Sequence, residues 1–249
     1  MKFLLLFLGL AVFVWSGQIQ AADIELPGIS VSFADKAEDK TEIAAALKVL
    51  LGLTVLSLVP AILVVMTSFT RIIVVLAILR HAFGMQQTPP NTVLISLALF
   101  LTVFNMAPVF KQINQQAFQP FMNDQMQPGH AFDLAMSPLR EFMIKQSREK
   151  DIALMIDLAG EEMPGTVEEI SNFTLIPAFM ISELKTAFQI GFVIFLPFLL
   201  IDLVVASILM SMGMLMVPPM MISLPIKIMM FVLIDGWNLV IEALMGSFL

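Results

Sequence analysis

Long apolar runs, separated by short polar stretches, dominate the chain. The longest covers residues 43–79 and is interrupted by Lys48, Pro60 and Arg71. At about 1.5 Å per residue, one straight helix of this length would far exceed a hydrocarbon core of about 30 Å. Together with the next apolar run, this pattern predicts a bent first helical hairpin over residues 43–110.

Two further apolar runs predict a second hairpin over residues 186–249, with a methionine-rich loop at residues 211–221. In that loop Gly213 lowers helical stability, and Pro218 and Pro219 cannot lie in a helix interior without breaking a hydrogen bond. The helix is therefore expected to stop there and to resume beyond the two prolines.

The segment between the hairpins, residues 111–185, has a different character, with 11 acidic and 6 basic residues. Apolar residues recur at helical spacing in its second half. Ser137 and Pro138 predict the start of a helix there, and Gly160 predicts its end. We expect a polar, mostly helical region outside the cytoplasm, and an all-α fold for the whole chain.

The N-terminal residues have the pattern of a secretory signal. Lys2 precedes an apolar run of about 13 residues, too short to span a bilayer, and small residues follow at Ala21 and Ala22. The sequence predicts a signal peptide over residues 1–21 and a flexible acidic N-terminus over residues 22–42.

The composition is typical of a membrane protein, because 59% of residues are hydrophobic and only 13% are charged. The formal net charge is −7 and no basic tract is present, which argues against a nucleic-acid partner. The chain has no cysteine and two histidines, which excludes disulfides and thiolate metal sites. No phosphate-binding loop occurs, and we expect no cofactor, no metal and no enzymatic activity.

Two acidic residues, Asp202 and Asp235, lie inside the last apolar runs. A charged residue in the middle of a membrane helix costs about 2.5 to 3.5 kcal/mol on insertion scales, so such residues usually face protein. One hypothesis is an ion or proton relay. The other is a helix cap or a hydrogen bond between chains.

Four charged residues are candidates for ion pairs. Glu183, Lys185 and Lys227 lie near the ends of apolar runs and could pair in an antiparallel hairpin, and Arg148 is a further candidate. The alternative is that they are ordinary interfacial charges whose long stems reach toward water.

Eight of the 20 methionines lie between Met210 and Met230. They could fill an irregular apolar core, or bind Cu(I) through their thioethers. They could also line a pore if several copies of the loop surrounded an axis, because hydrophobic constrictions close pores by excluding water. The residues alone leave these three interpretations open.

Two stretches, PAFMISELKTAFQIGF at residues 177–192 and PIKIMMFVLIDGW at residues 225–237, closely resemble signature stretches of the FliP family, with GMLMVPP between them. The resemblance covers most of the chain from residue 43 onward. It implies a flagellar biosynthetic protein of the type III export gate, assembled in several copies with FliQ and FliR family proteins into a closed pore. FlhB and FlhA family components and unfolded flagellar subunits would be further partners.

The resemblance also implies roles for individual residues. A methionine gasket falls on Met214, Leu215 and Met216, although many relatives have methionine where this chain has Leu215. Contacts between neighbouring subunits fall on Arg148, Glu183 and Lys227. The family motifs further include Lys185, Asp235, Gly236 and Trp237, for which the resemblance implies no defined role.

The sequence therefore predicts a non-enzymatic, pore-forming export-gate subunit in the bacterial inner membrane, at the flagellar basal body and largely facing the periplasm. It would contact membrane lipid. One alternative is a gate subunit of a virulence-type injectisome. Others are an ion-coupled small-molecule transporter that uses Asp202 and Asp235, and an assembly scaffold without a pore of its own.

Overall fold

The computed structural model describes residues 25–26, 29–30, 40–85, 87–161, 164–166, 169–214 and 217–248. The expected signal peptide lies outside these residues, as does much of the expected acidic N-terminus. The chain divides into two compact units, Met1–Val59 and Pro60–Leu249, which we call unit 1 and unit 2.

Unit 1 contains a short antiparallel pair of strands, β1 (Glu25–Leu26) and β2 (Ile29–Ser30), and most of helix α2 (Lys40–Val65). These two-residue strands are the only strands among the described residues, and helices make up nearly all the rest. The prediction of an all-α fold is confirmed.

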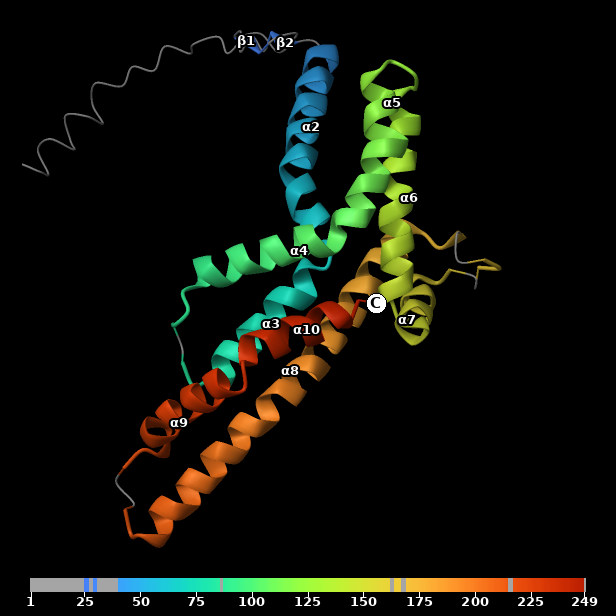
Figure 1. Ribbon diagram of the computed structural model, residues 1–249. Coiled ribbons are helices and arrows are strands. Elements are labelled where there is room, and N and C mark those ends of the chain that lie inside the picture. The colour runs from blue at the N-terminus through green and yellow to red at the C-terminus, as the bar shows by residue number, and fades with distance from the viewer. Residues whose placement is uncertain are drawn as a thin grey trace, which may run out of the picture. The chain divides into compact units, whose positions relative to one another are not determined.

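Unit 2 consists of helices whose order is shown in Figure 1. They are α3 (Phe69–Ala82), α4 (Asn91–Ile113), the π-helix η1 (Asn114–Phe118), α5 (Gln119–Met122), α6 (Pro128–Gln146), α7 (Glu149–Ala159), α8 (Asn172–Ser211), α9 (Pro219–Leu233) and α10 (Gly236–Gly246).

Helices α3 and α8 pack side by side as the centre of unit 2 (Figure 1). Gly191 of α8 permits a close approach, because a Cβ atom there would lie 2.4 Å from Cδ1 of Ile78 on α3. A buried cluster forms around this contact from Ile72, Val75, Leu76, Leu94, Ala98, Ala187, Leu244 and Phe248. Burial of this apolar surface is the main force that holds α3 against α8.

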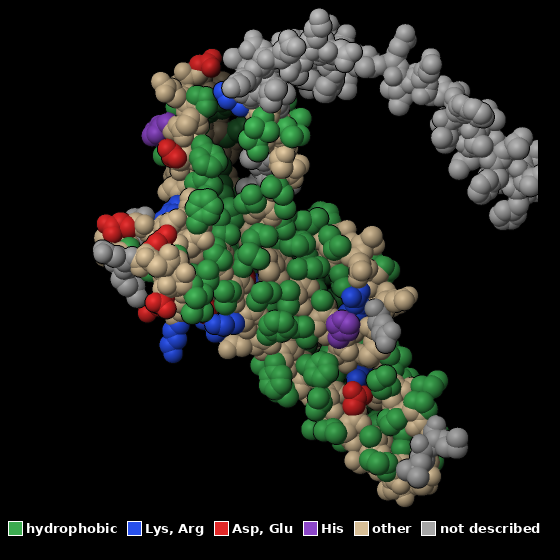
Figure 2. Space-filling model, turned by 180° about the vertical axis from the view of Figure 1, so that it is seen from behind, with side chains coloured by type: hydrophobic (Ala, Val, Ile, Leu, Met, Phe, Trp, Pro, Cys, Tyr) green, Lys and Arg blue, Asp and Glu red, His purple; other side chains and the backbone are tan. Residues whose placement is uncertain are grey.

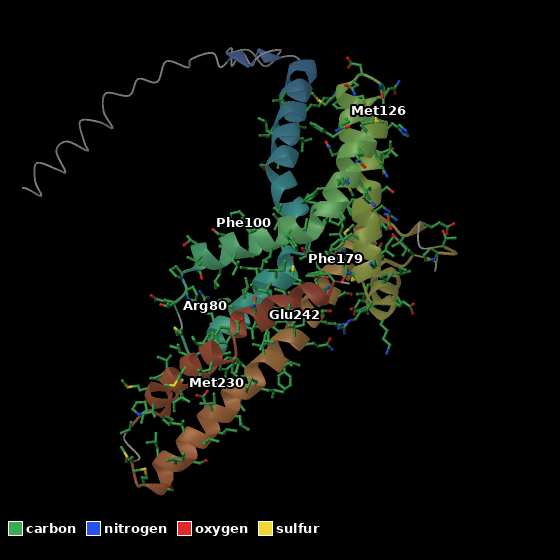
Figure 3. All side chains as sticks on the ribbon, viewed as in Figure 1. Arg80, Phe100, Met126, Phe179, Met230 and Glu242 are labelled. Carbon is green, nitrogen blue, oxygen red and sulfur yellow. The ribbon has the colours of Figure 1, made fainter. Side chains whose placement is uncertain are left out.

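Two more apolar clusters extend the core in opposite directions along α8. One joins it to α4 and α6 around Phe179, which is labelled in Figure 3. The ring centroids of Phe142 and Phe179 lie 5.9 Å apart. The other joins it to α3, α9 and α10 through three buried phenylalanines, Phe83, Phe198 and Phe231. The three clusters fix the helices that carry the charged contacts described below.

The helix boundaries differ from the expected ones in the middle of the chain. Ser137 and Pro138 do not start a helix, because α6 already begins at Pro128 and continues through Pro138. The first-turn position of Pro128 needs no N–H donor, which makes it the better helix start. The expected end at Gly160 is confirmed, since this residue adopts a left-handed conformation with φ 66° after α7.

Continuous helices also cross the segment limits expected from composition. α4 extends to Ile113, and α8 passes through residue 185 without a break. Charged residues near these limits make the sequence more polar there, but the helices continue through them.

Two stretches of the described residues are long and apolar enough to span a membrane, Asn91–Met122 and Asn172–Ser211. The pair α9 and α10 passes the same test together, but it is bent by 69° at the break between the two helices. These helices fit the membrane hairpins that the apolar pattern predicts.

Candidate functional site: charged contacts and the methionine-rich turn

Arg71 on α3 forms a buried contact site with residues from three other parts of unit 2. Its Nε and Nη2 atoms donate to the two carboxylate oxygens of Glu183, the first at 2.9 Å. Nη2 also donates to Oε1 of Gln146 at 2.9 Å, and Nη1 donates to the carbonyl and hydroxyl oxygens of Ser247 at 2.8 and 3.0 Å. The ring of Phe248 lies 3.9 Å from the guanidinium carbon.

This arrangement compensates a charge that would otherwise be costly to bury. Arg71 and Glu183 are both almost fully buried, and a paired, hydrogen-bonded geometry is the condition under which buried charges are tolerated. The planar guanidinium can face a carboxylate and three further acceptor atoms at once, which an ammonium group cannot do in the same geometry. α3, α6, α8 and the turn after α10 are thereby joined at one residue.

A second charged contact joins α7 to α8. The Ser182 hydroxyl donates to Oδ2 of Asp151 at 2.8 Å and accepts from the backbone N–H of Arg148 at 3.0 Å. Lys185 donates to the other carboxylate oxygen of Asp151. Burial raises the pKa of the Asp151 carboxyl, but the hydrogen bonds from Lys185 and Ser182 outweigh this, so the net pKa lies below its ordinary value.

A third charged contact lies where α8, α9 and the end of α3 meet. Nζ of Lys227 donates to Oδ2 of Asp202 at 2.6 Å and to the carbonyl oxygen of Ala82 at 3.0 Å. The Ser223 hydroxyl donates to the other oxygen of Asp202 at 2.6 Å. Lys227 is nearly buried, whereas the side chain of Asp202 is 35% exposed.

The structure gives each of the four candidate charged residues a hydrogen-bonding partner within the chain. Glu183 and Lys227 do not pair with each other within the described chain, because Arg71 and Asp202 occupy them. The side chain of Arg148 donates to Thr186 and Gln189 on α8. Contacts of Arg148, Glu183 and Lys227 between subunits concern an assembly of chains and stay a prediction.

The sequence pattern did not identify Arg71 as a site residue, although it shows Arg71 as a charge within an apolar run. Its partner Glu183 is 112 residues away, so no local spacing connects the two. An arginine inside an apolar run does signal that a buried acceptor must exist somewhere. Only the packing of α3 on α8 identifies which acceptor it is.

Asp235 marks the bend between α9 and α10. It adopts a left-handed conformation, with φ 52° and ψ 50°, and its exposed side chain accepts from the amide of Asn238 at 2.7 Å. The next residue, Gly236, lies so close to Phe231 that a Cβ atom would come within 2.2 Å of the ring. The indole of Trp237 packs edge-on against the same ring, 5.5 Å from it. Asp235, Gly236 and Trp237 therefore shape this bend.

The methionine-rich turn joins α8 to α9. Gly213 has φ 74°, and the N–H of Met214 bonds to the carbonyl of Leu209 at 3.0 Å, which closes the end of α8. Pro218 is the N-cap of α9 and Pro219 is its first residue. Leu215 and Met216 lie outside those residues.

Met210 belongs to the last turn of α8 and not to the turn itself. The methionine side chains on either side of residues 215–216 are exposed, namely those of Met210, Met212, Met214, Met220 and Met221. Among the described residues, no group of three or more His, Asp or Glu side chains is placed to hold a metal ion. What this end of unit 2 offers chemically is a set of accessible, flexible thioethers.

Comparison with known proteins places these features in a family. The sequence pattern of the FliP family matches residues 52–244. The chain is 53% identical over 210 residues to the flagellar biosynthetic protein FliP of Bacillus subtilis, which covers 84% of this chain and 95% of that protein. It is 54% identical over 200 residues to the protein of the same name from Caulobacter vibrioides, covering 80% of this chain and 75% of that protein. The chain therefore belongs to the FliP family.

Proposed function

We propose that this protein is a pore-forming subunit of the flagellar type III export gate in the bacterial inner membrane, and that unfolded flagellar subunits pass through the pore. The observation that carries this proposal is the turn between α8 and α9, where exposed methionines gather between two apolar helices. In a ring of several copies, Met214, Leu215 and Met216 would close the resting channel by excluding water.

The exposed apolar surface of unit 2 supports assembly with other proteins and lipid. Phe100 and Phe104 on α4 are 75% and 74% exposed, and the outer face of α8 is also apolar. Figure 2 shows apolar side chains over much of the visible face, and Figure 3 shows Phe100 on α4. Apolar patches of this extent on one chain mark contacts with protein or membrane. Further copies of this chain and FliQ, FliR, FlhB and FlhA family proteins are the proposed partners.

The proposed contacts between subunits place different demands on the three charged residues. Arg148 is partly exposed and can reach a neighbouring copy from its present position. Glu183 and Lys227 are buried against Arg71 and Asp202, so they would have to exchange those partners during assembly. Arg148 is therefore the first of the three to examine by crosslinking between copies.

The contacts of Asp202 and Asp235 support an ion-coupled transporter less well than an export gate. The carboxylate of Asp202 is already neutralised by Lys227, and Asp235 lies exposed at a bend. The family names of the relatives favour the flagellar system over an injectisome.

The test replaces residues 214–216 by glycine and measures the resting ion conductance of the assembled complex in planar bilayers. Glycine cannot fill a constriction, so we expect an ion leak while export of flagellar subunits persists. Met122→Gly, at an exposed methionine at the end of α5, serves as the control and should not leak. A resting conductance equal to that of the unaltered complex would remove the gasket from the proposal.

A further inference from the structure

We propose that the methionines around the α8–α9 turn form an oxidation site, at which a peroxide converts their thioethers to sulfoxides and thereby opens the resting channel. The modification itself is argued from the exposed side chains of this chain. Its effect on the channel rests on the proposed function above.

Exposure separates these methionines from those in the core. Met212, Met214, Met220 and Met221 are between 40% and 72% exposed. By contrast, the core methionines Met66, Met106 and Met143 are at most 1% exposed. Oxidants reach sulfur atoms from solvent, so the turn should react first.

The reaction is balanced by the peroxide alone. A lone pair of the methionine sulfur attacks one peroxide oxygen, the O–O bond breaks and an S–O bond forms. The sulfur is oxidised by two electrons, the peroxide is reduced, and water leaves with the second oxygen. The product is a polar sulfoxide that accepts hydrogen bonds from water, and sulfoxide reductases reverse it.

The consequence depends on where the sulfoxides form. A hydrophobic constriction stays closed because water is unstable between apolar side chains. Several sulfoxides in one ring would stabilise that water, even though the backbone of the turn is unchanged. The φ of 74° at Gly213 and the two prolines shape the turn through its backbone.

Met122 provides a matched comparison within the same chain. It is 63% exposed but lies at the end of α5, far along the chain from the turn. Its sulfur should oxidise as readily as those of the turn, yet its sulfoxide should not affect conductance. Accessibility and position can therefore be tested separately.

The first experiment measures the modification. The purified assembled complex is treated with hydrogen peroxide, and peptide mass spectrometry follows each methionine over time. We expect Met212, Met214, Met220 and Met221 to be oxidised at least about tenfold faster than Met66, Met106 and Met143. Equal rates in the two groups, or faster oxidation of the core group, would overturn the proposal.

The second experiment measures the consequence. Peroxide should raise the resting conductance of the unaltered complex, and methionine sulfoxide reductases for both epimers, supplied with a dithiol as reductant, should restore it. A variant with Leu at positions 210, 212, 214, 216, 220 and 221 keeps the apolar volume but has no methionine sulfur around the turn, so its conductance should not respond. Met122→Leu should respond like the unaltered complex. A response of the Leu-substituted turn, or none in the unaltered complex, would refute the effect on the channel.

The glycine variant of residues 214–216 shows whether the redox sensitivity or the gasket itself is refuted. If that variant leaks but oxidation of the turn changes nothing, the gasket stands and its redox sensitivity is refuted. If neither treatment changes the conductance, the gasket itself is refuted.

Discussion

Arg71 and Glu183 meet in the interior of unit 2, where Nε of the arginine donates to a carboxylate oxygen at 2.9 Å and neither side chain is more than 2% exposed. The pair joins α3 to α8 across 112 residues of sequence. Arg71 also donates to the carbonyl oxygen of Ser247, which directly follows α10. The site therefore connects α3 with the end of α10.

Removing one member of this pair should be far more damaging than removing both. Glu183→Leu leaves the Arg71 guanidinium buried without its counter-charge and should lower the free energy of unfolding by about 3 to 5 kcal/mol. The double variant Arg71→Leu with Glu183→Leu should recover much of that loss. Urea unfolding in detergent measures both effects.

Glu242→Gln supplies the control for these variants, because Glu242 is an exposed carboxylate on α10 (Figure 3). It should change stability by less than about 0.5 kcal/mol. A loss in the double variant equal to the sum of the losses in Arg71→Leu and Glu183→Leu would show that the two buried charges do not depend on each other.

The pair of Lys227 and Asp202 should respond asymmetrically to mutation. Asp202→Asn leaves a nearly buried ammonium without its carboxylate, whereas Lys227→Met leaves a carboxylate that is 35% exposed and can be hydrated. We therefore expect Asp202→Asn to lower the thermal midpoint further than Lys227→Met. The reverse order would mean that the contact of Lys227 with the Ala82 carbonyl matters more than the ion pair.

The contribution of Asp151 to stability should depend on pH. Its folded pKa lies below the ordinary value of 3.8, so the unfolded chain binds its proton first as the pH falls. The stabilisation is therefore complete well above pH 3.8 and is lost as the pH falls through the folded pKa. Asp151→Asn should be less stable than the unaltered protein at neutral pH by about 1 to 3 kcal/mol.

The measurement compares unfolding midpoints of the two proteins across this pH range. The difference between them should shrink as the pH drops below 3.8. Asp157→Asn, at an exposed aspartate on the same helix, should track the unaltered protein throughout. A constant difference between Asp151→Asn and the unaltered protein at all pH values would contradict the assignment.

The close approach of α3 and α8 should make Gly191 sensitive to a single added carbon. Gly191→Ala places a Cβ atom 2.4 Å from Ile78 and should cost about 1 to 3 kcal/mol through overpacking. Ile78→Ala in the same chain removes the opposing atoms and should recover part of the loss.

Gly129→Ala is the matched control, because it lies in α6 with no neighbouring atom within 4 Å of the added carbon. Alanine is the better helix former, so this change should be neutral or slightly stabilising. If Gly191→Ala changed the free energy of unfolding as little as Gly129→Ala, α3 and α8 would have to move apart at little energetic cost.

The sequence predicted the helical fold because apolar runs of this length have few other stable forms. It also predicted the ends at Gly160 and Gly213, where left-handed backbone favours glycine. It failed at Pro138, which resembles a helix start but lies inside α6. A proline loses only one backbone hydrogen bond, and packing of α6 in the core can outweigh that loss.

The partners of the charged residues were harder to predict than the residues themselves. Asp202, Glu183 and Lys227 were recognised because charges are costly in apolar runs. Glu183 was one of several residues with which Lys227 could pair, and the packing of α9 against α8 brings Lys227 to Asp202. Such pairing depends on the rotation of each helix about its axis, which apolar runs leave poorly defined when almost every face is hydrophobic.

The buried arginine also sets an order of events during synthesis. Ser247 and Phe248 follow Arg71 by about 176 residues, and Arg71 has its full set of acceptors only when they are in place. At synthesis rates of about 5 to 20 residues per second, α3 waits roughly 10 to 35 seconds for them. A nascent chain halted before these residues would leave the Arg71 guanidinium without the two oxygen acceptors of Ser247 and without the ring of Phe248.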